Sequence, residues 1–207
     1  MVARQRRHVQ ERRRQSRSVI SRVERFKRGD VLLAVDVFND FDHEDGDRLL
    51  DSFRERAPNM ERTIAAARAA GVPVVYVNDG HARWDGDVRR LVADALDGKG
   101  GKLLEPLVPR DGEPLLLKHR YSAFDHTALD ILLESLGGTR VLLIGAATEA
   151  CVVQTAIDAR ELGLKASIVV DACARTDQEL EEIAIRYASR VGGVHLEEEP
   201  VSRASGV

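Results

Sequence analysis

A cysteine in a strand–turn–helix pattern is the residue of this chain best placed to act as a nucleophile. An apolar run from Val141 to Ile144 predicts a buried strand, and Gly145 with two alanines predicts a tight turn. Thr148 is a candidate N-cap for the next helix, and Gly163 is its expected end. Cys151 would then lie in the first helical turn, where the helix dipole favours a thiolate and free N–H groups can hold an oxyanion. A lone cysteine is, however, more often a small buried apolar residue.

Two charged residues stand at the ends of other apolar runs. Asp36 lies at the end of the run from Val31 to Val37, and Lys118 closes the run that starts at Leu115. If the strands are parallel, both residues and Cys151 meet at one edge of the sheet. A lysine there lowers the pKa of the thiol, and an aspartate can take its proton and return it to a leaving amine. The structural alternatives are a helix-capping aspartate and a surface lysine.

Strand and helix patterns alternate along most of the chain. Strands are predicted at 31–37, 72–77, 115–118, 141–144, 168–170 and 194–196, and helices at 49–70, 88–96, 128–136, 148–162 and 179–190. The first helix is expected to break at Ala57-Pro58. The run Gly98-Lys99-Gly100-Gly101 has the composition of a flexible loop. Near-continuous apolar strands of this kind indicate a parallel sheet covered by helices on both faces.

Composition and charge fit one globular domain with a basic head. Of 207 residues, 43% are hydrophobic and 31% charged, and no apolar run approaches the ~20 residues that span a membrane. Residues 1–28 hold eleven Lys or Arg and two Glu, a net +9, so the remainder of the chain carries −12. An acidic body makes nucleic acid an improbable partner. Only two cysteines are present, which favours a reducing, cytoplasmic location over a disulfide framework.

Three short motifs resemble those of the isochorismatase-like cysteine hydrolases. D-V-F-N-D-F starts at Asp36, L-K-H-R-Y-S-A-F contains Lys118, and G-A-A-T-E-A-C-V contains Cys151. The resemblance covers roughly residues 29–196. It implies a three-layer α/β/α sandwich, Rossmann-like, with a six-stranded, mainly parallel sheet in the order 3-2-1-4-5-6. It also implies a catalytic triad of Asp36, Lys118 and Cys151, a cis peptide between Ala146 and Ala147, and oxyanion donors in the backbone N–H groups of Ala147 and Cys151.

The chain departs from parts of the family pattern. Phe38 stands where members often have Gln, so a polar contact is expected to be missing or replaced. The metal motif of nicotinamidases is represented only by Asp79 and His81, with no second histidine nearby, so no cofactor is expected and these two are weak candidates. The stretch Y-V-N-D-G-H-A-R-W instead resembles an uncharacterised branch of the family. Three aromatic residues are then candidates for lining a substrate pocket or, equally, for ordinary core packing: Phe41, Trp84 and Phe124.

The resemblance implies a hydrolase of a small amide, carbamoyl or ureido compound that works through a thioester on the cysteine. Vinyl-ether hydrolysis and a non-enzymatic scaffold are the alternatives. We expect a homo-oligomer, dimer or tetramer, with no membrane partner. The expected organisation is a basic arm over residues 1–28, partly helical or disordered, a hydrolase domain over 29–197 and a loose tail over 198–207. In the arm, an apolar helical stripe of Val19, Ile20, Val23 and Phe26 is expected to dock on the body or on a second copy.

Overall fold

A computed structural model describes residues 21–22, 26–81 and 83–198. Its strands are β1 (Ser21–Arg22), β2 (Asp30–Val35), β3 (Val74–Asp79), β4 (Leu115–Lys118), β5 (Arg140–Gly145), β6 (Lys165–Cys173) and β7 (His195–Glu198). Its helices are α2 (Gly46–Ala69), α3 (Val88–Asp97), α4 (Gly101–Leu104), α5 (Leu129–Ser135), α6 (Val153–Glu161) and α7 (Gln178–Arg190), with short helical turns η1 (Glu105–Leu107) and η2 (Thr148–Val152). No helix in this described part is both long and apolar enough to span a membrane.

All strands run parallel in one sheet of order β1-β7-β6-β5-β2-β3-β4. The predicted order of six strands is confirmed, because it corresponds to β4-β3-β2-β5-β6-β7. The two-residue strand β1 extends the sheet beside β7, and nothing in its polar sequence indicated it. The helix predicted through residues 19–26 is contradicted at Ser21 and Arg22, which form β1. Its other predicted stripe residues Val19, Ile20 and Val23 lie outside the described residues. Glu198, the expected start of a loose tail, is the last residue of β7.

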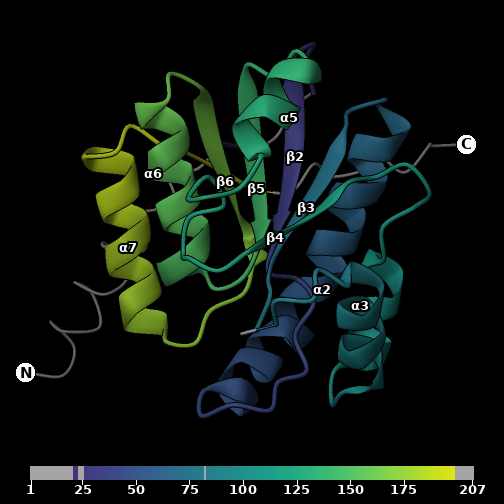
Figure 1. Cartoon of the computed structure of the whole chain (residues 1–207). Helices are drawn as coiled ribbons and strands as arrows, with labels where there is room; N and C mark the ends of the chain where they lie inside the picture. The colour runs from purple at the N-terminus through teal and green to yellow at the C-terminus, as the bar shows by residue number, and fades with distance from the viewer. Residues whose placement is uncertain (1–20, 23–25, 82, 199–207) are drawn as a thin grey trace, which may run out of the picture.

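The helices form a layer on each face of the sheet (Figure 1). Helices α2, α3 and α4 pack against one face, and α5, α6 and α7 against the other, each through its own apolar cluster. Strands β2 and β5 lie at the centre and every residue of β2 is buried, as a strand covered on both faces requires. The three-layer α/β/α architecture implied by the family resemblance is therefore present.

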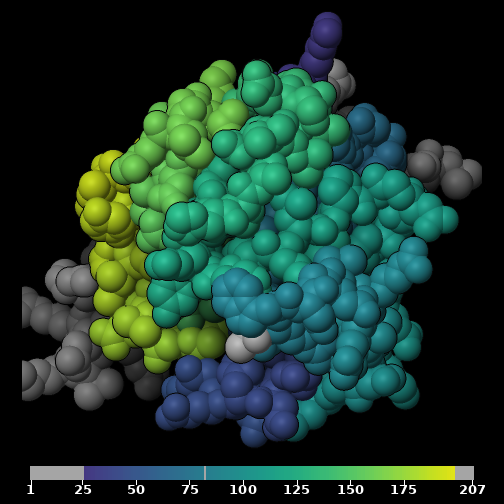
Figure 2. Space-filling view, viewed as in Figure 1, coloured from purple at the N-terminus to yellow at the C-terminus, as the bar shows by residue number. Residues whose placement is uncertain are grey.

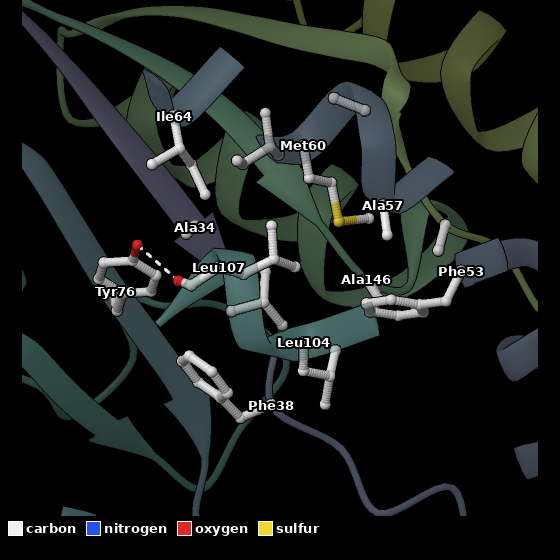
Figure 3. Packing of buried hydrophobic residues seen from close by; sticks show 14 of the residues in the cluster. Ala34, Phe38, Phe53, Ala57, Met60, Ile64, Tyr76, Leu104, Leu107 and Ala146 are labelled. Carbon is white, nitrogen blue, oxygen red and sulfur yellow. Dashed lines mark hydrogen bonds between the residues drawn. The ribbon is translucent and has the colours of Figure 1, made fainter. Parts of the chain in front are cut away.

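The core on the α2 face is closed by the loop after β2 and by η1. Phe38 packs against the ring of Tyr76, with the ring centroids 5.9 Å apart, and the hydroxyl of Tyr76 donates a 2.8 Å hydrogen bond to the carbonyl of Leu107 (Figure 3). The position where relatives often carry Gln is thus a core position here. Met60 and Ile64 of α2 fill the space above the sheet in the same view.

Two local expectations were wrong for packing reasons. Helix α2 runs unbroken through Pro58, because apolar residues on both sides of the proline, Phe53 and Met60 among them, are buried on the same face. The glycines near residue 100 serve close packing rather than flexibility. A Cβ at Gly100 would lie 2.2 Å from the ring of Phe41, and a Cβ at Gly101 would lie 1.8 Å from the carbonyl oxygen of Leu96.

Candidate active site

The sheet brings three predicted catalytic residues together at the carboxyl ends of its strands. Asp36 directly follows β2, Lys118 is the last residue of β4, and Cys151 lies in the η2 turn that follows β5. Asp79, the last residue of β3, joins them because β3 lies between β2 and β4. The parallel arrangement is the physical cause, since it places the carboxyl ends of all these strands at one edge.

Lys118 is the centre of the site. Its ammonium nitrogen Nζ lies 2.8 Å from Oδ2 of Asp36 and 3.3 Å from Sγ of Cys151. It also donates a 2.9 Å hydrogen bond to the carbonyl of Arg120 and lies 3.9 Å from Oδ2 of Asp79. The Lys118 side chain is fully buried and that of Asp36 is 12% exposed, so the ion pair is largely shielded from water.

The backbone around Asp36 explains why a short acidic residue stands there. Its φ of 49° lies in the left-handed region, which Asp and Asn tolerate better than most other residues. Its N–H donates to the carbonyl of Val77, and its Oδ1 accepts a 2.6 Å hydrogen bond from the N–H of Asp79. Oδ1 is thus held by the neighbouring strand, while Oδ2 faces Lys118.

Asn78 fixes the loop after β2 and was not singled out by the sequence. This side chain is 1% exposed, accepts from the N–H of Phe38 at 2.9 Å and donates to the carbonyl of the same residue at 3.0 Å. Both polar groups of the amide are thereby used on one backbone unit. Asn78 therefore holds the residue two places after Asp36 in register with β3.

The nucleophile turn departs from the expected helix start. Gly145 has a φ of 122°, and a Cβ there would lie 1.8 Å from the carbonyl oxygen of Val35, so only glycine fits. A cis peptide joins Ala146 and Ala147, as the family resemblance implied. Thr148 is not the N-cap, because its hydroxyl is buried and donates to Ala174 and Glu181, and Cys151 lies in a π-helical turn ahead of α6. The prediction that the helix stops at Gly163 is confirmed, because the last residue of α6 is Glu161, two residues before that glycine.

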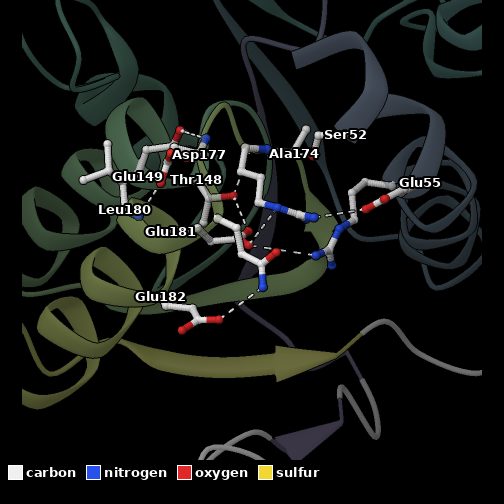
Figure 4. Close-up of polar contacts among 12 residues, drawn as sticks. Ser52, Glu55, Thr148, Glu149, Ala174, Asp177, Leu180, Glu181 and Glu182 are labelled. Carbon is white, nitrogen blue, oxygen red and sulfur yellow. Dashed lines mark hydrogen bonds and ion pairs between the residues drawn. The ribbon is translucent and has the colours of Figure 1, made fainter. Parts of the chain in front are cut away.

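A polar network beneath the turn ties it to the start of α7 (Figure 4). Oε1 of Glu149 accepts hydrogen bonds from the N–H and hydroxyl of Thr176 and from the N–H of Asp177. Glu181 accepts from the Thr148 hydroxyl at 3.1 Å and lies 3.5 Å from Nε of Arg175. Because these groups come from segments far apart in the sequence, no local pattern indicated them. The network holds the backbone on which Cys151 is carried.

Burial changes the expected pKa of the Cys151 thiol. Burial, together with the nearby charge of Asp36, raises the pKa of the Cys151 thiol to about 12, and Lys118 offsets this only in part. Burial also raises the pKa of the Asp36 carboxyl, against the opposing effect of Lys118. Burial lowers the pKa of the Lys118 ammonium, but Asp36, Cys151 and Asp79 together raise it further, so the net shift is upward. The pKa of the Cys151 thiol is therefore raised, against the expectation that the helix start and Lys118 would lower it.

The raised pKa of the Cys151 thiol predicts an unusual pH dependence of its alkylation. Iodoacetamide reacts with the thiolate, so labelling of Cys151 should rise about tenfold per pH unit and continue rising above about pH 9, where an ordinary thiol levels off. Asp36→Asn removes the negative charge that raises the thiol pKa, and should speed labelling about tenfold at about pH 8. Peptide mass spectrometry separates Cys151 from Cys173, which is fully buried. The exposed Glu161→Gln is the matched control, and equal or slower labelling of Asp36→Asn would contradict the assignment.

The three candidate pocket aromatics lie in different surroundings. Phe41 is fully buried and packs edge-to-face on Phe53 with centroids 5.2 Å apart, as its core-packing alternative predicted. Trp84 is 81% exposed and stacks on His119, which follows Lys118, with ring centroids 4.0 Å apart. Trp84 thus lies at the surface, whereas Phe41 lies in the core. Phe124 is half-buried and packs at the edge of the α5–α7 core.

The weak metal candidates serve other contacts. Oδ1 of Asp79 accepts the N–H of His81, and Oδ2 of Asp79 faces Lys118. Nε2 of His81 lies 3.4 Å from the carbonyl of Phe38. Within residues 26–81 and 83–198, no three His, Cys, Asp or Glu side chains are grouped as a metal site would need. Asp79 thus belongs to the surroundings of Lys118, a role that its motif alone did not indicate.

The arginines near this edge are engaged with neighbouring acids. Arg83 forms an ion pair with Asp94 of α3. The guanidinium of Arg120 lies 3.9 Å from Asp125 and is largely exposed, while its carbonyl accepts from Lys118. Of the two, only Arg120 presents a largely exposed cation within two residues of Lys118 in the sequence.

Comparison with known proteins agrees with this geometry. The model of the isochorismatase domain family matches residues 30–199. The uncharacterized isochorismatase family protein YaaI of Bacillus subtilis (strain 168) is 28% identical over 161 residues, 78% of this chain and 89% of that protein. The ureidoacrylate amidohydrolase RutB of Enterobacter sp. (strain 638) is 33% identical over 125 residues, 48% of this chain and 53% of that protein.

A solved structure of an amidase has the same fold. The N-carbamoylsarcosine amidase of Thermoplasma acidophilum superposes with a TM-score of 0.63 at 30% identity, over 82% of this chain and 95% of that one. The family match covers most of the chain and includes the three strand ends that carry Asp36, Lys118 and Cys151. This protein is therefore a member of the isochorismatase family.

Proposed function

We propose that this protein is a cysteine hydrolase that cleaves a small amide, carbamoyl or ureido compound through a thioester on Cys151. The observation that carries the proposal is the position of Lys118 Nζ, 2.8 Å from the Asp36 carboxylate and 3.3 Å from the Cys151 sulfur. One buried cation thereby orients a base and a nucleophile toward each other. The relatives named above include a ureidoacrylate amidohydrolase and a carbamoylsarcosine amidase, which supports the same class of bond.

In the first half-reaction the thiol proton passes to Asp36 as Sγ attacks the substrate carbonyl carbon. Because burial raises the pKa of both groups, the thiol gives up its proton only as the carbon–sulfur bond forms. Lys118 stabilises the negative charge that passes through the sulfur. The tetrahedral intermediate then expels the amine, which takes its proton from Asp36, and the acyl group remains on Cys151 as a thioester.

In the second half-reaction water replaces the amine. Asp36, again ionised, takes a proton from water as the oxygen attacks the thioester carbonyl, and the thiolate leaves and regains that proton. We assign the oxyanion of both tetrahedral intermediates to the backbone N–H groups of Ala147 and Cys151. One observation supports this assignment. Ala147 lies outside the helices and strands, and its N–H donates to no backbone carbonyl of the described residues.

Two other readings remain distinguishable by experiment. Vinyl-ether hydrolysis would not require a thioester, so it predicts activity without Cys151. A scaffold protein predicts no turnover at all and no special reactivity of either cysteine. The two cysteines are free, which fits our proposal of a cytoplasmic enzyme.

An ammonia-release screen of small primary amides, N-carbamoyl compounds and ureides tests the proposal. The wild-type chain should release ammonia from at least one of these classes, and Cys151→Ala, used as the blank, should not. A parallel panel of vinyl ethers, read by release of the carbonyl product, covers the second candidate. Turnover confined to the vinyl ethers, or retained in Cys151→Ala, would refute the thioester mechanism.

A further inference from the structure

Helix α7 carries a row of large apolar side chains that faces solvent. Leu180, Ile183, Tyr187 and Val191 are 54%, 47%, 55% and 68% exposed. Their spacings of three and four residues place them on one face of the helix and just past its end. We call these four residues the α7 stripe.

A different face of α7 already supplies its packing to the core. Glu181 and Ala188 are buried there, and the helix contacts η2, α6 and β7. In Figure 1, α7 is the outermost helix on its side of the sheet, and in Figure 2 its yellow atoms lie at the surface. A helix of this kind normally turns a polar face to water, so a contiguous apolar row indicates a binding surface.

The charges beside the stripe are arranged by sign along the helix. Glu179 and Glu182 lie in its N-terminal half, and Arg186 and Arg190 lie in its C-terminal half, all exposed. If two copies of α7 pack antiparallel, the acidic half of each helix faces the basic half of the other. Parallel packing would instead set like charges side by side.

We propose that the α7 stripe is the centre of a two-fold symmetric dimer of this chain, with the two α7 helices antiparallel. The stripe of one copy can pack on the stripe of a second copy. A two-fold axis between Ile183 and Tyr187 places Ile183 of each copy against Tyr187 of the other. The same axis places Glu179 near Arg190 of the second copy, twice in each dimer. A partner of one charge sign would meet both attraction and repulsion along this helix. The inference rests on surface residues alone and is independent of the proposed reaction.

The apolar part of the interface is tested by light scattering after size exclusion of the full chain at about 50 µM. Wild type should run as a dimer. Ile183→Gln with Tyr187→Gln should raise the dimer dissociation constant more than about thirtyfold, because apolar and aromatic residues at an interface centre carry much of the binding energy. Ile131→Gln is the matched control, since Ile131 is a 67% exposed apolar residue on α5. A monomeric wild type, or a dimer that the double substitution leaves intact, would overturn the proposal.

The antiparallel arrangement is tested by charge reversal. Arg190→Glu should weaken the dimer about tenfold at low salt, because each substitution acts twice across a two-fold axis. Adding Glu179→Arg to the same chain exchanges the two charges and should restore the wild-type dissociation constant. Further weakening in that double variant would show that the two residues do not face each other.

Discussion

Replacement of Cys151 by alanine is expected to reduce turnover of an amide, carbamoyl or ureido substrate by more than about 10⁴-fold. The only other cysteine of the sequence, Cys173, is fully buried in β6, where its Sγ faces the carbonyl of Leu143. Without the sulfur, Asp36 and Lys118 retain their ion pair but have no nucleophile to activate. The substitution should change the free energy of unfolding by only about 1 kcal/mol, since Cys151 is half-buried and alanine is a good helix former.

The control for this variant is Cys173→Ala, which should keep its activity. Steady-state ammonia release measures turnover, and urea unfolding followed by circular dichroism measures the free energy of unfolding. Loss of activity in Cys151→Ala together with loss of fold would not support the chemical role. Activity in a folded Cys151→Ala would exclude covalent catalysis.

Lys118→Met is expected to cost about 3–5 kcal/mol of unfolding free energy as well as the activity. Methionine fills a similar volume, but it leaves the shielded Asp36 carboxylate without its cation at 2.8 Å. The exposed Lys102→Met is the matched control and should change the unfolding free energy by no more than about 0.5 kcal/mol.

The cost of Lys118→Met should depend on pH in a defined direction. Without the ammonium, burial raises the pKa of Asp36 still further above its unfolded value, so the folded state favours the protonated acid. A raised carboxyl pKa means that stability is lost as pH rises, so the variant should be nearer to wild type at about pH 5 than at about pH 8. Asp36→Asn in the same chain should recover about 2 kcal/mol at about pH 8. Additive effects of the two substitutions would show that the pair does not interact.

The fold, and the meeting of Asp36, Lys118 and Cys151 at one edge of the sheet, could be predicted because each depends on a local pattern. Apolar runs specify the strands, and parallel pairing then places Asp36, Lys118 and Cys151 at one edge whatever the loops do. The family motifs fall on the same residues, which is why strand order and site agree. The structure also explains why glycine stands at position 145, since a side chain there would collide with the carbonyl of Val35.

The features that were missed depend on the depth of burial and on distant contacts. The sequence places Cys151 at a helix start, where a dipole lowers a thiol pKa, but burial and the Asp36 charge outweigh that effect. The sequence left Phe41 open between a pocket and the core, and the absence of a Cβ at Gly100 leaves the room in which its ring packs. The Thr148 hydroxyl is drawn to Ala174 and Glu181, which no local rule could anticipate.

The most direct test of the central claim is intact-protein mass spectrometry of the enzyme quenched with acid during turnover of a substrate found in the screen. The proposed mechanism predicts a population of protein heavier by the acyl group, located on the Cys151 peptide, chased by water and lost in Cys151→Ala. Asp36→Asn should form little of this adduct, because the neutral thiol then has no base. Turnover at full rate with no adduct at any quench time, combined with activity in Cys151→Ala, would contradict the account.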